Sequence, residues 1–367
     1  MINKERLLNT FLDYVRIDSE SGHEKNMAQR IAADLKAIGC EIYVDDTMDK
    51  TGSDTGNLFA TLPGTAPGDP IMLCAHMDTV VPGAGVKPVV EDGVVRTDGT
   101  TVLGADDKSG VVAIVEAMRT VVEQNIPHPT VQAVFTVCEE IGLLGSRHMD
   151  YDRVIAKKAA VLDSSVPGYI VTGGPGQYKI NAAVIGRKAH AGGAPERGIS
   201  AIQVLCEAIS NMKQLRIDPE TTANIGSIHA DYPTNIVAER ATMCAECRSR
   251  DAAKLEQQVK HMEDCLHLAC EKYGAVLELE RSKTYDSYRH DENDPFIQEM
   301  SAAMIRAGLT PVLSATGGGS DVNNFCLHGI TALMVGTGMS KVHTTEEQIS
   351  IDDLNNTARM VLELIKA

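Results

Sequence analysis

Apolar positions recur at helical spacing in the first part of the chain. Residues 4–15 place apolar side chains three and four positions apart, which is typical of a helix with one buried face. Ser21 precedes Glu24 by three positions, and this is the spacing of a capping box at the start of a second helix. Gly39 is expected to end that helix. Two amphipathic helices are therefore expected before the first strand.

Short, continuous apolar runs follow, and three of them end in acidic residues or histidine. A run of this kind predicts a buried strand. The runs are 71–75 before His76 and Asp78, 131–137 before Glu139 and Glu140, and 159–162 before Asp163. A helix is expected over residues 111–122, between the first two runs. Strands that alternate with helices predict an α/β fold with a doubly wound, mostly parallel sheet and helices on both faces.

The carboxyl ends of parallel strands meet at one edge of such a sheet, and ligands bind outside that edge. His76, the pair Glu139 and Glu140, and Asp163 are all expected there. Three separate observations along the sequence therefore predict one cluster of polar side chains.

The pattern changes near residue 177. The elements expected from there follow the order strand, helix, strand, strand, helix, strand, which is the ferredoxin-like arrangement of a small domain. After residue 292 the earlier alternation resumes. We therefore expect a catalytic domain made of residues 1–176 and 293–367, interrupted by an inserted α+β domain over residues 177–292.

Charge and cysteine content exclude several classes of protein. A formal net charge of -16 would repel nucleic acid and anionic membranes, so neither is expected as a partner. No apolar run is long enough to cross a bilayer and no apolar leader is evident, so a soluble, cytoplasmic protein is expected. Nine scattered cysteines indicate reduced thiols. Cys244 and Cys247 lie three positions apart in a predicted strand, so they should point to opposite faces as packing residues.

Five candidate metal ligands lie at predicted strand ends or in loops. They are His76, Asp106, Glu140, Asp163 and His343. Two imidazoles and three carboxylates suit zinc, cobalt or manganese, and five ligands suit two ions if one carboxylate bridges them. Each residue taken singly has an ordinary explanation, because acidic pairs are common in solvated turns and at helix N-termini. Their joint placement favours a metal site.

Two further carboxylates would complete such a site. Asp78 lies two residues after His76, on the same side of an extended chain, where it can fix the orientation of the imidazole. Glu139 and Glu140 are adjacent and point apart in extended backbone. One of them can bind a metal while the other serves as general base toward a metal-activated water.

Nine short motifs that carry these residues are spread along the chain. They are Cys-Ala-His76-Met-Asp78-Thr, Leu-Gly-Ala-Asp106-Asp-Lys-Ser-Gly, Cys-Glu139-Glu140-Ile-Gly, Leu-Asp163-Ser, Lys-Ala-His190-Ala-Gly, Thr-Asn235-Ile-Val, Glu-Cys-Arg248-Ser, Gly-Gly-Gly-Ser320-Asp and Val-His343-Thr. In this order they resemble the di-zinc metallopeptidase family that includes peptidase T, carboxypeptidase G and the aminoacylases. The resemblance covers nearly the whole chain, and within the family the chain is most similar to the peptidase T branch.

The resemblance implies that the cofactors are two divalent ions, namely zinc. Asp106 would bridge them, and one histidine with one carboxylate would complete the ligands of each ion. These pairs are His76 with Asp163 and His343 with Glu140. The bridge is assigned to Asp106 rather than Asp107 because Asp106 precedes the x-Lys-x-Gly sequence that follows the bridging residue in relatives.

The resemblance also implies roles in catalysis and in the inserted domain. Glu139 would be the general base, and Asp78 would orient His76. The inserted domain would act as a lid and as the surface of a homodimer. His190 would stabilise the oxyanion, in relatives often from the partner subunit. The residues expected to contact the substrate are Asn235, Arg248, Gly318 and Gly319.

The expected function is that of a zinc-dependent exopeptidase, an aminopeptidase that hydrolyses short peptides with a metal-bound hydroxide and Glu139 as base. An N-acyl amino acid deacylase of the same family would need the same metals and the same base. The two differ in whether the substrate must carry a free α-amine. A non-catalytic metal-binding or peptide-binding relative is the third alternative, and it would have no use for a non-ligating carboxylate beside the water.

Overall fold

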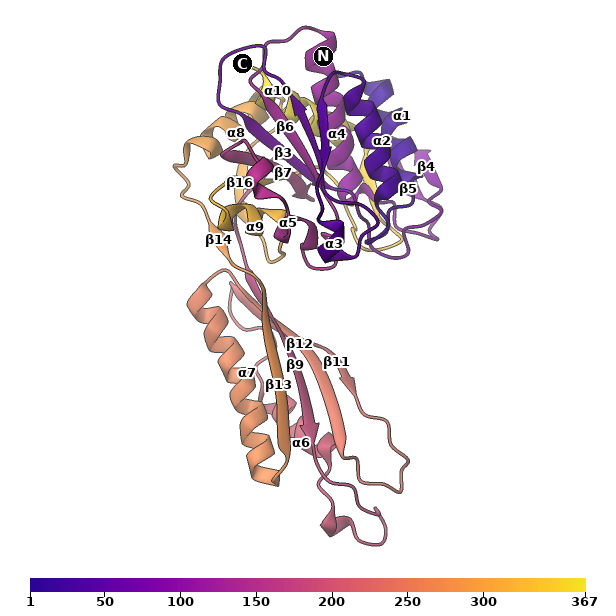
Figure 1. The fold of residues 1–367 in the computed structure, drawn as a ribbon, viewed down its shortest axis with the longest axis vertical. Coiled ribbons are helices and arrows are strands. Elements are labelled where there is room, and N and C mark those ends of the chain that lie inside the picture. The colour runs from indigo at the N-terminus through magenta and orange to yellow at the C-terminus, as the bar shows by residue number, and fades with distance from the viewer. The chain divides into compact units, whose positions relative to one another are not determined.

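The computed structural model describes all 367 residues, and the chain divides into two compact units. Unit 1 comprises Met1–Thr172, His290–Ala315 and Ser320–Ala367, and unit 2 comprises Gly173–Arg289 and Thr316–Gly319. The insertion was expected over residues 177–292. Unit 2 begins four residues earlier and ends three residues earlier than that, and it also includes the segment Thr316–Gly319. Figure 1 follows the chain through both units.

The large sheet of unit 1 confirms the expected α/β class. Within unit 1 the strand order is β1-β2-β6-β3-β7-β16-β8, and β15 also pairs with β8. The central strands β6 (Val131–Thr136), β3 (Ile71–His76), β7 (Lys158–Ser164) and β16 (Thr331–Gly336) are parallel. The flanking strands β1 (Glu41–Val44), β2 (Leu58–Leu62) and β8 (Tyr169–Gly174) are antiparallel to their neighbours; β15 spans Val312–Ala315. Every residue of β3 and β6 is buried, which explains their continuous apolar sequence.

Helices cover both faces of this sheet, most of them on one side. The larger layer contains α1 (Lys4–Val15), α2 (Lys25–Lys36), α4 (Ala105–Glu123), α8 (Pro295–Arg306) and α10 (Ile351–Ile365), and Figure 1 shows α1, α2 and α4 side by side. Their apolar faces join the odd-numbered residues of β3 in one core cluster. The short α9 (Asp321–Leu327) packs on β16, and α5 (Leu144–Arg147) packs on α9.

Smaller elements complete unit 1. They are α3 (Met48–Thr51), the 3₁₀ helix Tyr151–Arg153, and a three-stranded sheet of β4 (Pro88–Glu91), β5 (Val94–Thr97) and β17 (Gln348–Ser350). The hairpin of β4 and β5 lies in the Gly- and Pro-rich region after the first buried strand. The third strand, β17, comes from near the C-terminus, and it joins this hairpin to the end of the chain.

The capping box expected at Ser21 and Glu24 does not form. Helix α2 begins at Lys25, and its N-cap residue Glu24 makes no side-chain cap hydrogen bond. Ser21 instead donates to Asp78 at 2.6 Å, and the Glu24 carboxylate accepts from the backbone of Cys138 at 3.0 Å. Asp78 and Cys138, which are distant in sequence, thus bond to these side chains in place of the local capping interaction.

Unit 2 has the expected ferredoxin-like order. Its antiparallel sheet has the order β10-β11-β12-β9-β13. The elements are β9 (Gly176–Ile185), the 3₁₀ helix Pro195–Arg197, α6 (Ala201–Asn211), β10 (Leu215–Arg216), β11 (Thr221–His229), β12 (Arg240–Ser249), α7 (Ala252–Tyr273), β13 (Val276–Tyr285) and β14 (Tyr288–Arg289). Both long helices pack on the sheet around a separate apolar core. Cys247 is buried and Cys244 is exposed, so they lie on opposite faces as expected, but only Cys247 is a packing residue.

Two other features of the chain bear on the expectations. The Gly319 position lies against Tyr285, because a Cβ atom there would clash with the Tyr285 ring. This close approach requires glycine, and it explains how the segment Thr316–Gly319 joins unit 2. None of the helices combines the length and the apolar composition that crossing a membrane demands.

Candidate metal centre

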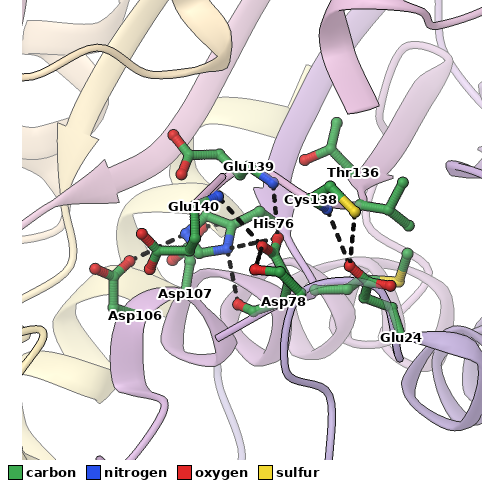
Figure 2. Close-up of polar contacts among 12 residues, drawn as sticks. Glu24, His76, Asp78, Asp106, Asp107, Thr136, Cys138, Glu139 and Glu140 are labelled. Carbon is green, nitrogen blue, oxygen red and sulfur yellow. Dashed lines mark hydrogen bonds and ion pairs between the residues drawn. The ribbon is translucent and has the colours of Figure 1, made fainter. Parts of the chain in front are cut away.

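The polar cluster lies at the carboxyl ends of the parallel strands. His76 is the last residue of β3, Glu139 and Glu140 follow β6, and Asp163 lies near the end of β7. Asp106 is the second residue of α4, where the backbone is not helical. Figure 2 shows the Glu140 carboxylate on the side of Asp106, whereas that of Glu139 extends away from it.

The Asp106 carboxylate lies between two imidazoles. Its Oδ1 is 3.1 Å from His76 Nε2, and its Oδ2 is 3.3 Å from His343 Nε2. His343 Nε2 is also 3.0 Å from the Glu140 carboxylate, and His76 Nε2 is 3.8 Å from Asp163 Oδ1. The structure therefore brings together all five residues that the sequence singled out as ligands. One carboxylate that offers an oxygen to each side is the arrangement a bridging ligand needs.

Asp107 has different partners. Its Oδ2 accepts from the backbone N–H of His76 at 3.3 Å, and its Oδ1 accepts from the N–H of Gly110 at 3.2 Å. It is fully buried, and one of its oxygens still lies within 4.8 Å of ligand atoms of His76 and Asp163. Asp106 thus faces two imidazole rings, whereas Asp107 fastens the backbone of β3 to the start of α4.

A main-chain hydrogen bond selects the tautomer of His76. Its Nδ1 lies 3.0 Å from the carbonyl oxygen of Asp78. Because a carbonyl can only accept, Nδ1 carries a hydrogen, and Nε2 is the nitrogen available to a metal. That nitrogen is the one that faces Asp106 and Asp163.

The Asp78 carboxylate organises the same strand ends. Its Oδ1 is 3.5 Å from His76 Nδ1 and accepts from the N–H of Glu139 at 2.9 Å. Its Oδ2 accepts from the N–H of Glu140 at 3.2 Å and from the Ser21 hydroxyl at 2.6 Å. Burial opposes ionisation, but the hydrogen bonds from His76 and Ser21 outweigh it and lower the pKa of Asp78. An ionised Asp78 therefore orients one imidazole and the backbone of both glutamates.

Glu24 supports the turn from the opposite side, and the sequence had not indicated this role. Its buried carboxylate accepts from the backbone N–H groups of Gly22 at 2.9 Å and Cys138 at 3.0 Å, and from the Ser53 hydroxyl at 2.5 Å. Figure 2 shows it beside Cys138, the residue before Glu139. No local signal separates this use of Glu24 from helix capping.

The crowding of carboxylates alters their protonation. Burial and the nearby charge of Asp163 raise the pKa of Glu139 well above its usual range, and burial with the charge of Asp106 does the same for Asp163. Hydrogen bonds to Asp106 and Glu140 raise the pKa of His343 to about 10. In the metal-free protein, protons held by these groups thus offset the repulsion between the carboxylates. Divalent cations bound there would relieve the same repulsion. Imidazole nitrogens and carboxylate oxygens are donors that fit such cations.

Truncation of Asp78 is expected to loosen this centre without removing a ligand. In Asp78→Ala, His76 loses the carboxylate beside Nδ1, and the N–H groups of Glu139 and Glu140 lose their acceptor. Loss of comparable outer-shell partners costs about 10–100-fold in metal affinity or activity. Calorimetric titration of the metal-free variant with zinc measures this loss. An affinity equal to that of the parent would show that Asp78 does not orient His76.

The remaining predicted site residues belong to unit 2. His190 Nδ1 accepts from the N–H groups of Gly192 and Gly193 at 3.1 and 3.0 Å. Arg248 pairs with Glu246 at 2.9 Å. Asn235 lies before β12, and its carbonyl accepts from the N–H of Ala191. The N–H of Gly318 donates to the Thr316 hydroxyl. Their roles toward a substrate stay predictions.

Comparison with known proteins identifies the family. Residues 72–367 match the model of peptidase family M20/M25/M40. The chain belongs to this peptidase family. The uncharacterized protein YqjE of Bacillus subtilis is 42% identical over all of this chain and 99% of its own length.

Solved structures agree with that assignment. The aminopeptidase PepT of Bacillus cereus is 42% identical with a TM-score of 0.92, over 99% of this chain and 98% of that one. A tripeptidase of Staphylococcus aureus is 39% identical with a TM-score of 0.97, over 100% and 98% of the two chains. The expected resemblance to the peptidase T branch of the M20 peptidases is thereby confirmed.

Proposed function

We propose that the protein is a metal-dependent aminopeptidase that releases the N-terminal residue of tripeptides. The observation that carries the proposal is the Asp106 carboxylate, which offers one oxygen to each of two imidazoles at the carboxyl edge of the sheet. The full-length similarity to an aminopeptidase and a tripeptidase of the same family supports the substrate class.

In this proposal Asp106 would bridge two divalent ions, zinc as the resemblance implies. His76 and Asp163 would complete the ligands of one ion, and His343 and Glu140 would complete those of the other. When bound, such a pair of ions supplies Lewis acidity toward the scissile carbonyl and lowers the pKa of water. The donor set fits because both imidazoles face the bridging carboxylate through Nε2.

Glu139 is the proposed general base. Its backbone is held by Asp78, and its carboxylate extends away from the proposed ligand Glu140. Burial and the charge of Asp163 raise its pKa in the metal-free protein, and bound cations would lower that pKa toward the range that suits a general base. Glu139 would take the proton of the attacking water and then pass it to the leaving amine.

Unit 2 completes the proposal. His190 would donate to the oxyanion, and Asn235, Arg248 and the amides of Gly318 and Gly319 would contact polar groups of the peptide. Arg248 is paired with Glu246, so a substrate carboxylate would replace one anionic partner with another. We further propose a homodimer formed through unit 2, as the resemblance implies.

A matched substrate panel tests the proposed function. Zinc-loaded and chelator-stripped protein would be assayed on a free tripeptide, the same tripeptide with an acetylated N-terminus, the corresponding dipeptide, and N-acetyl amino acids. We expect metal-dependent release of the N-terminal residue from the free tripeptide only. Cleavage of only the acetylated compounds would identify a deacylase. No cleavage with any divalent metal would favour the non-catalytic alternative.

Metal affinity is expected to rise with pH. Hydrogen bonds to Asp106 and Glu140 raise the pKa of His343 to about 10 in the metal-free protein, so His343 is protonated at neutral pH. A metal must displace that proton, and the competition strengthens as pH falls. For each proton displaced, the affinity should change by about tenfold per pH unit below pH 10.

Zinc titrations at pH 6, 7 and 8 in buffers of different ionisation enthalpy would measure the affinity and the protons released. His343→Ala provides the control, because it should release fewer protons. Affinity that does not vary with pH in the parent would contradict the assignment of His343 as a ligand.

A further inference from the structure

Glu347 makes an unusual set of contacts beside the metal centre. Its side chain is buried, with 1% exposed. Oε2 accepts from the backbone N–H groups of Leu103 and Gly104, both at 2.8 Å, and Oε1 accepts from the N–H of Asp106 at 2.9 Å. One carboxylate therefore holds the segment that leads into the central ligand.

The same residue belongs to the turn that carries His343. Ser340 and Gln348 close the base of this turn by donating their N–H groups to each other's carbonyls at 2.9 and 3.1 Å. Glu347 lies next to that base, and its N–H donates to the carbonyl of Thr344 at 3.1 Å. Glu347 is thus fixed to the His343 turn by its backbone and to the Asp106 segment by its side chain.

The chemistry of the contact favours a carboxylate. Three N–H donors converge on two oxygens, and hydrogen bonds to an ionised acceptor are about twice as strong as neutral ones. A glutamine would turn an NH₂ group toward at least one of these donors. Burial raises the pKa of Glu347 to about 7, whereas the same three N–H donors act to lower it.

We propose that Glu347 is a positioning residue that sets the distance between Asp106 and His343, and thereby shapes the site of the ion that these two residues share. The inference rests on the proposed metal-dependent function. His343 Nε2 and Asp106 Oδ2 are 3.3 Å apart, and they come from segments more than 200 positions apart in the sequence. Glu347 bonds one segment to the other directly.

Glu116 offers a matched control. Its carboxylate is buried in unit 1 and accepts from the backbone N–H of Asn3 at 3.1 Å and from Arg6 at 2.8 Å. It lies on α4, as Asp106 does, but roughly 15 Å further along the helix at 1.5 Å per residue. Glu116→Gln therefore makes the same chemical change in the same unit, away from the metal centre.

The test titrates metal-free protein with cobalt, followed by its absorption spectrum, and with zinc in a calorimeter. For Glu347→Gln we expect the affinity for one of two ions to fall about 10–100-fold, as for other outer-shell partners, with an altered cobalt spectrum for that ion. Glu116→Gln should keep both affinities and the parental spectrum, even if its melting temperature falls. Glu347→Asp keeps the charge but shortens the side chain, so it should also weaken the same ion.

These outcomes distinguish a failure of the proposed function from a failure of the positioning role of Glu347. A parent protein that binds no divalent ion would overturn the proposed function. If the parent binds two ions and Glu347→Gln matches its affinities and spectrum, the positioning role alone is wrong. Equal weakening by Glu116→Gln would also overturn it, because the effect would then reflect general loosening of the core. If Glu347→Gln fails to fold, the comparison of Glu347→Asp with the parent decides.

Discussion

Replacement of Glu139 by glutamine is expected to lower kcat on a tripeptide by roughly 10²–10⁴-fold, the range of general acid–base catalysis. The amide has nearly the shape of the carboxyl group but cannot accept the proton of the attacking water. Both metal ions should remain bound, because the proposed ligand at this turn is Glu140, whose carboxylate lies 3.0 Å from His343.

The neighbouring residue supplies the control. Glu140→Gln makes the same change one position along, and it should reduce metal content as well as activity. Steady-state kinetics and elemental analysis of the purified variants measure both effects. A Glu139→Gln protein as active as the parent would remove the general-base assignment. Loss of metal from that variant would instead make Glu139 a ligand.

Asp106→Asn is expected to have the largest effect on metal content. The amide offers one oxygen and one NH₂ group, so it cannot supply an anionic oxygen to both imidazole sides. Outer-shell changes cost about 10–100-fold in affinity, and loss of a bridging ligand should exceed the upper end of that range. We expect metal content to fall from two ions to at most one, with activity close to the background rate.

Asp107→Asn distinguishes the two adjacent aspartates. Burial raises the pKa of Asp107 well above its usual range, so this position favours a neutral group such as an amide in the metal-free protein. Its partners are the N–H groups of His76 and Gly110. The variant should be less stable to thermal unfolding but should bind two ions. If Asp107→Asn loses both ions while Asp106→Asn keeps them, the bridging position moves by one residue.

The sequence by itself determined the class of fold and the membership of the polar cluster. Continuous apolar runs predicted β3, β6 and β7 because strands buried on both faces have no polar side to alternate with. Parallel strands end at the same edge, so His76, Glu140 and Asp163 could be placed together without coordinates. The period-two geometry of a strand likewise placed Cys244 and Cys247 on opposite faces, although only the structure shows that Cys247 alone is buried.

Only the tertiary structure decided which partner each of several polar groups takes. Ser21 and Glu24 have the spacing of a capping box, yet Ser21 donates to Asp78 and Glu24 accepts from Cys138, because polar side chains bond to whichever partners the fold brings within reach. Glu347 carries no motif of its own, and its importance appears only in three bonds across more than 200 positions. Strand and helix periods are local properties of the chain, whereas hydrogen-bond partners distant in sequence depend on packing that no local pattern encodes.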